Sequence, residues 1–149
     1  MIHGMALGIL HNLVGWLLYP VLVGLAICLL VVLWECGSAL GERLGALSRM
    51  QSHGAGFFEH YALRRLERVD LLARSGPILG LMGTLIPLGP GLSALGSGDI
   101  DLLATAMTVA FDTTVLGLLI GLVGYGLGRV RRRWYEACLQ QIEQGGVHG

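Results

Sequence analysis

Three long stretches of this chain carry almost no charge, and every arginine lies between or after them. Residues 13–34 and 75–95 contain no charged residue, and residues 102–128 contain a single one, Asp112. Because an α-helix rises about 1.5 Å per residue, about 20 apolar residues cross the roughly 30 Å hydrocarbon core of a bilayer. The pattern predicts an all-α integral membrane protein with three transmembrane helices. We expect the first helix to remain in the mature chain, because no Lys or Arg precedes it as in a signal peptide.

The second of these stretches is interrupted by Gly and Pro. Pro77 fits the first turn of a helix, whereas Pro87 and Pro90 remove backbone hydrogen bonds and are expected to kink or end it. Inside a bilayer such breaks persist where protein or water satisfies the freed carbonyl groups. We therefore expect this helix to pack against other helices and not against lipid.

The arginines predict how the chain is oriented. They lie in residues 35–74 and 129–149, whereas residues 1–12 and the polar turn at 96–101 contain none. By the positive-inside bias, both arginine-rich segments are cytoplasmic, and the N-terminus and the turn are external. The Arg131–Arg133 cluster is then an orientation signal, with binding of acidic lipid headgroups as the weaker alternative. The chain is therefore expected to be a multi-pass membrane protein.

The cytoplasmic segment is too short for a domain with its own core. From Phe57 onward, its apolar residues recur at a spacing that predicts an amphipathic helix leading into the second span. The pattern leaves open whether this helix lies at the interface or continues the membrane helix. Residues 37–56, rich in Gly and Ser, indicate a weak helix or a linker.

Composition supports the membrane assignment and argues against other classes of protein. Hydrophobic residues make up 54% of the chain and charged residues 13%, and the mean hydropathy of +0.68 is outside the range of ordinary soluble domains. The sequence has no phosphate-binding loop, no nucleophile elbow and no His or Cys pair at ligand spacing. We therefore expect no enzymatic activity, no cofactor, no metal site and no nucleic-acid partner.

Small residues predict where the helices pack. On a helical wheel one smooth stripe follows the third span, formed by Ala106, Ala110, Thr114, Gly117, Gly121, Gly124 and Gly128. Such stripes let helix backbones approach closely in membranes. Together with Gly80 and Gly83 in the second span, Gly117, Gly121 and Gly124 are therefore assigned to helix packing.

Asp112 lies on a different face of the third span, which it shares with Thr105 and Thr108. An ionised carboxylate inside a membrane is costly and is a functional-site hypothesis by default. A helix with two specialised faces needs a neighbour on each, and a second copy of the chain is the simplest second neighbour. Asp112 is then a group that binds or relays a proton, or a structural acid bonded to Thr108 or to a backbone carbonyl.

Two motifs resemble those of a known family. Residues 75–86 read Ser-Gly-Pro-Ile-Leu-Gly-Leu-Met-Gly-Thr-Leu-Ile, and residues 110–118 read Ala-Phe-Asp-Thr-Thr-Val-Leu-Gly-Leu. They are similar to the Gly-Pro-x-Leu-Gly-Leu-x-Gly-Thr and Ala-x-x-x-Thr-x-x-Gly-Leu motifs of the MotA/TolQ/ExbB proton-channel proteins. The resemblance covers about residues 74–135.

The resemblance implies a membrane ion-channel subunit that assembles as a ring, usually of five copies, around the helices of a smaller partner. That partner would be a single-span protein of the ExbD/TolR type, and it generally carries the ion-binding Asp. Thr84 and Thr114 match the pore-facing threonines of the family. ExbB-like members often carry a Glu where this chain has Val109, and Asp112, one turn later, can replace it. The short cytoplasmic segment argues against a MotA-type flagellar stator.

These observations lead to one functional hypothesis and one alternative. The hypothesis is a subunit that conducts ions, most simply protons, in an inner-membrane complex that couples the proton-motive force to work by a partner. Its candidate ion pathway contains Thr84, Thr105, Thr108, Asp112 and Thr114. The alternative is a non-conducting scaffold or small permease subunit in which Asp112 only fixes the helix register.

Overall fold

The structure, a computed structural model, describes residues 1–46 and 55–147. Among them, three helices are long and apolar enough to cross a membrane, so the predicted all-helical fold with three such helices is confirmed. They are α1 (Ile2–Gly41), α3 (Ala55–Gly96) and α4 (Ile100–Val147), and a short π-helix, η1 (Glu42–Ala46), follows α1. Residues 47–54, which belong to the predicted weak helix or linker, lie outside the described residues.

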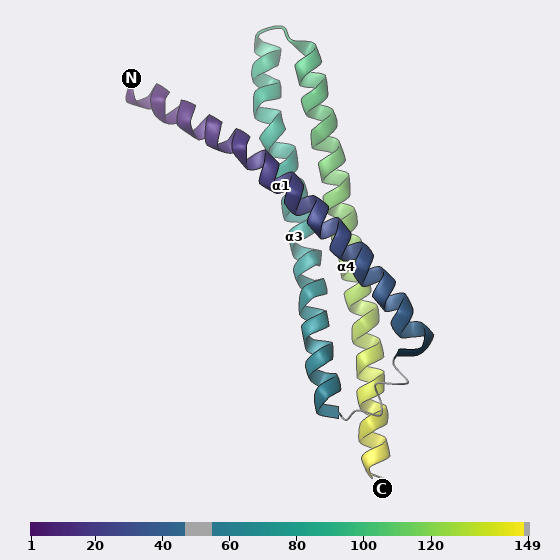
Figure 1. Ribbon diagram of the computed structural model, residues 1–149. Helices are drawn as coiled ribbons and strands as arrows, with labels where there is room; N and C mark the ends of the chain where they lie inside the picture. Colours follow the sequence, from purple (N-terminus) through teal and green to yellow (C-terminus); the bar gives the residue numbers. More distant parts are fainter. Residues whose placement is uncertain (47–54, 148–149) are drawn as a thin grey trace.

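Helices α3 and α4 form one long antiparallel hairpin (Figure 1). The chain reverses between them at Gly98, whose φ of +82° lies in the left-handed region that glycine adopts without steric cost. Asp99 then caps α4, because its carboxylate accepts a hydrogen bond from the backbone N–H of Leu102 at 3.1 Å. The polar turn therefore fixes where α4 begins.

Both hairpin helices are longer than the apolar stretches in the sequence. Helix α3 has 42 residues and α4 has 48, so each is at least about 60 Å long, twice the hydrocarbon thickness. The segment that leads into the second span is thus continuous with it in α3. The helix also runs through Pro87 and Pro90 to Gly96, so neither proline ends it. Each proline removes one backbone hydrogen bond of the helix, although its fixed φ is compatible with a helix. The packing of α3 along α4 outweighs the cost of the lost hydrogen bond.

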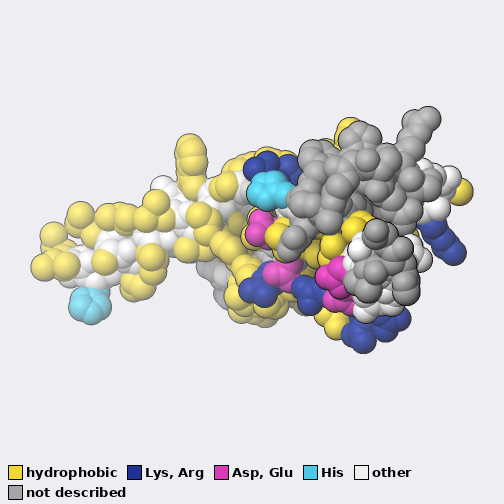
Figure 2. Space-filling view, turned by 90° about the horizontal axis from the view of Figure 1, so that it is seen from below, with side chains coloured by type: hydrophobic (Ala, Val, Ile, Leu, Met, Phe, Trp, Pro, Cys, Tyr) yellow, Lys and Arg dark blue, Asp and Glu magenta, His cyan; other side chains and the backbone are white. Residues whose placement is uncertain are grey.

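Helix α1 crosses the hairpin obliquely and leaves it toward its N-terminal end (Figure 1). Its buried residues run from Val21 to Ala39. One hydrophobic core joins the three helices, with Leu25 and Val32 from α1, Leu72 from α3 and Ile120 from α4. Seen from below, the N-terminal part of α1 extends as an apolar arm, and charged side chains gather at the opposite side of the view (Figure 2).

Candidate functional site

Helices α3 and α4 meet at backbone-to-backbone distance along their glycines. A methyl group added at Gly117 would lie 2.6 Å from both the carbonyl oxygen of Gly76 and the Cα of Gly80. A methyl group at Gly80 would in turn lie 3.1 Å from the Cα of Gly117. The two helices cross here with no room for a side chain, as expected for small residues at membrane helix contacts.

The same contact continues in both directions from Gly117. Toward the hairpin tip, a methyl group at Gly83 would lie 2.7 Å from the Cβ of the buried Thr113. Toward the other end, a methyl group at Gly121 would lie 2.6 Å from the ring of Pro77, and one at Gly124 would lie 3.1 Å from the backbone N of Ala73. All five glycines assigned to packing therefore lie in this interface.

Thr84 on α3 and Thr114 on α4 are hydrogen-bonded to each other through their hydroxyl groups, just beyond the glycine contact. Both hydroxyls also reach the carbonyl oxygen of Ala110, at 3.4 Å from Thr84 and 2.8 Å from Thr114. Thr84 has a further acceptor in the carbonyl oxygen of Gly80, at 3.0 Å. Because each hydroxyl carries one proton, these bonds are alternatives to one another, and the pair can change donor and acceptor in place.

Asp112, Thr105 and Thr108 lie on the exposed surface of α4. The hydroxyls of Thr105 and Thr108 donate to carbonyl oxygens of their own helix, those of Asp101 and Ala104, each at 2.9 Å. Thr108 is therefore not bonded to Asp112 in this structure. One protomer does not bring the three residues together with the Thr84–Thr114 pair, since Thr114 points to the opposite side of α4 from Asp112.

Asp112 lies near the level at which α1 leaves the hairpin. Gly24 of α1 faces Leu79 of α3, and Thr113 of α4 faces Gly83, one helical turn further toward the tip. The buried residues of α1 end at Val21, about one turn before Gly24. Asp112, the neighbour of Thr113 on α4, therefore lies close to the level at which α1 and the hairpin separate.

A family model for the MotA/TolQ/ExbB proton channel family matches residues 46–144, which include all of α3 and nearly all of α4. The chain belongs to this family. Comparison with curated proteins and comparison with solved structures each gave no significant match. Membership of the MotA/TolQ/ExbB family, together with three helices that can cross a membrane, indicates a multi-pass inner-membrane protein with an ion-channel role.

In this MotA/TolQ/ExbB member a buried polar cluster also ties α1 to the hairpin, and sequence reasoning missed it. The carboxylate of Glu35 on α1, 2% exposed, accepts hydrogen bonds from Arg131 on α4 and from Arg65 on α3, the latter at 3.3 Å. Arg131, fully buried, also donates to the backbone oxygen of Glu35 at 3.0 Å. Both arginines donate to the hydroxyl of Ser38, at 2.6 Å from Arg65 and 2.7 Å from Arg131. One acid on α1 thus connects all three helices.

The sequence signal for this cluster was weak. Glu35 is the first charged residue after the first span, and Arg131 belongs to an arginine cluster that membrane orientation already explains. The two residues are 96 positions apart, and no periodic pattern links them. The position of Glu35 is itself a useful signal. An acid directly after one span lies at the same membrane depth as an arginine directly after another, such as Arg131, so the two can meet between helices.

Proposed function

We propose that this chain is a proton-conducting subunit of an inner-membrane complex that couples the proton-motive force to work by a partner protein, as in ExbB/TolQ-type systems. Membership of the proton channel family supports an ion-channel role. The Thr84–Thr114 pair supports the assignment further, because it joins the two family motifs at one point of the hairpin.

The observation that carries the proposal is the exposure of Asp112 on the protomer surface. The residues around it on that surface include Phe111 and Val115, with exposed fractions of 60% and 67%. A carboxylate surrounded by apolar side chains in the middle of a span cannot face lipid at low cost. It therefore faces either another protein chain or a water-filled lumen in the assembled complex.

The two faces of α4 support assembly with other chains. Its glycine face is occupied by α3 within the protomer, whereas its Asp112 face is available to a neighbour. We propose a ring of copies, most simply five, with a single-span partner of the ExbD/TolR type in its centre. The arginine-rich ends are cytoplasmic in this proposal, the hairpin tip and the N-terminus are external, and the helix before the second span is amphipathic.

Proton flux through Asp112 and Asp101 variants would test the proposal. The full-length chain, purified with the subunits that accompany it, is reconstituted into vesicles with an internal pH-sensitive dye and an imposed potassium-diffusion potential. Asp112→Asn removes the ionisable group at nearly constant shape and is expected to lower the flux at least about tenfold, as loss of a proton-transfer group does. Asp101→Asn, in the exposed first turn of α4, is the matched control and is expected to leave the flux unchanged.

Size-exclusion chromatography of each variant separates loss of conduction from loss of assembly. A flux that is equal in the wild type and in Asp112→Asn would overturn the role of Asp112. Wild-type vesicles that conduct no better than protein-free vesicles, with the partner present, would favour the scaffold alternative.

A further inference from the structure

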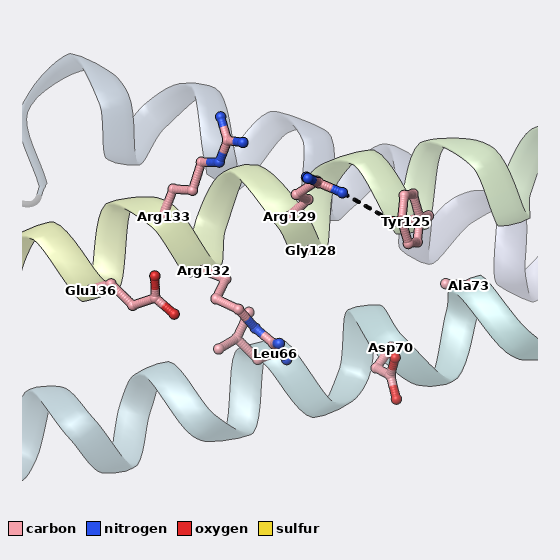
Figure 3. A pocket seen from close by; sticks show the side chains of 10 residues that line it. Leu66, Asp70, Ala73, Tyr125, Gly128, Arg129, Arg132, Arg133 and Glu136 are labelled. Carbon is pink, nitrogen blue, oxygen red and sulfur yellow. Dashed lines mark hydrogen bonds between the residues drawn. The ribbon is translucent and has the colours of Figure 1, made fainter.

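A groove of about 380 Å³ lies between α3 and α4 at the arginine-rich end of the hairpin (Figure 3). Its floor is formed by residues with little or no side chain, Ala73 from α3 and Gly124 and Gly128 from α4. The small residues that allow close packing further along the hairpin thus leave a hollow here. The groove is separate from Asp112 and from the Thr84–Thr114 pair.

The arginine cluster at this end divides between two environments. Arg131 is buried and turned to Glu35 on α1, whereas Arg132 and Arg133 line the groove together with Arg129. Arg132 and Arg133 follow Arg129 by three and four residues, so each lies next to Arg129 on the surface of α4. Figure 3 shows Arg132 extending toward Leu66 on α3, and Arg129 donates a hydrogen bond to the hydroxyl of Tyr125 at 3.2 Å.

The charges in the groove favour an anion. Its three guanidinium groups are accompanied by two carboxylates, those of Asp70 and Glu136. Asp70 is also paired with Arg74 at 3.1 Å. The groove therefore retains a positive excess, and guanidinium groups bind phosphate oxygens in a bidentate manner.

Exposed apolar side chains precede Tyr125, a lining residue of the groove, along α4. Leu122 and Leu118 occupy the preceding turns of α4 on the face of Tyr125, and they are 70% and 55% exposed. Arginines that follow an apolar span lie at the depth of lipid headgroups. An anion with an apolar chain attached therefore matches this surface better than a soluble anion does.

We propose that the groove binds the phosphate headgroup of an anionic phospholipid, with Arg129 and Arg132 as the main ligands and the acyl chains along Leu118 and Leu122. The site is independent of ion conduction, and its test measures lipid and not proton flux.

Lipid binding is measured by native mass spectrometry of the full-length chain in detergent, titrated with phosphatidylglycerol or with phosphatidylcholine. The groove variant combines Arg129→Gln and Arg132→Gln. The control variant combines Arg64→Gln and Arg68→Gln, which removes the same charge from exposed arginines of α3 outside the groove. Since one arginine near an anionic lipid is worth about fivefold in affinity, the groove variant is expected to bind phosphatidylglycerol at least about tenfold more weakly.

The control variant is expected to bind as the wild type does, and phosphatidylcholine to bind weakly to all three proteins. Equal losses of phosphatidylglycerol affinity in the two variants would overturn the proposal, because they would indicate a general electrostatic attraction of the lipid to the arginines and not a site in the groove. Full competition by soluble glycerol phosphate would also overturn it, since a free phosphate would then be the ligand. If the groove variant does not fold, Arg132→Gln is compared with Arg68→Gln, with a loss of about threefold or more expected in the first alone.

Discussion

Arg131 on α4 donates a hydrogen bond to the carboxylate of Glu35 on α1, and both side chains are buried. The pair lies at the same end of the molecule as the arginine groove. Helix α1 remains packed on the hairpin from Ala39 to Val21 and diverges from it beyond Val21, toward its N-terminal end (Figure 1). Glu35 therefore ties the C-terminal part of α1 to both helices of the hairpin.

Replacing Glu35 by Ala is expected to destabilise the protein by about 3 kcal/mol, because removal of one partner from a buried ion pair leaves a buried charge without its counter-ion. Asp70→Ala is the matched control. Its ion pair with Arg74 is exposed, at 62% and 77%, so a change below about 1 kcal/mol is expected. The measurement is unfolding in mixed micelles, followed by circular dichroism as denaturing detergent is added. Equal destabilisation by the two substitutions would contradict a stabilising role for the buried pair.

Replacing Gly117 by Ala tests the backbone contact of the hairpin. The added methyl group would meet backbone atoms of Gly76 and Gly80 at 2.6 Å, so the helices must move apart, at a cost of about 1–3 kcal/mol. Gly126→Ala introduces the same group on the same helix, with no atom within 4 Å. It is expected to be neutral or stabilising by up to about 1 kcal/mol, because alanine is the better helix former.

Thermal unfolding in detergent, followed by circular dichroism, compares the two alanine variants. The expected result is a lower unfolding temperature for Gly117→Ala and an unchanged or higher one for Gly126→Ala. A Gly117→Ala protein as stable as the wild type would mean that the hairpin accommodates the methyl group and that its glycines are not needed for packing.

The three helices could be predicted from the sequence because the charge-free stretches are long, and the family could be predicted from the motifs at residues 75–86 and 110–118. The glycine stripe also indicated which face of α4 is packed. These features depend on local pattern, and periodicity along one helix is visible in the sequence.

The Glu35 cluster and the division of the arginines could not be predicted in the same way. Whether Arg131 turns inward while Arg132 turns to the groove depends on where α1 crosses the hairpin, which is a property of tertiary packing. The continuity of α3 from Ala55 into the second span could not be predicted either, because the same amphipathic pattern fits a helix at the interface and a helix that extends a membrane span.

Replacing Thr84 and Thr114 by Val, singly and together, tests whether their hydroxyl pair belongs to the ion pathway. Valine keeps the shape but removes the donor and the acceptor, so a pair that exchanges protons is expected to lose at least about tenfold in flux in each single variant. The double variant is expected to be little worse than either single one, since residues that act as a unit are not additive.

Thr113→Val is the control, because Thr113 is buried against Gly83 and its hydroxyl bonds to carbonyl oxygens of α4, at 2.9 Å and 3.0 Å. Thr113→Val makes the same substitution at the position next to Thr114, and it is expected to leave the proton flux unchanged. The measurement is the dye assay in reconstituted vesicles. A flux that falls equally in all the valine variants would indicate loosened packing, and wild-type flux in the Thr84 and Thr114 variants would remove the pair from the pathway. Loss in these two alone would link the family motifs to conduction through one hydrogen-bonded pair.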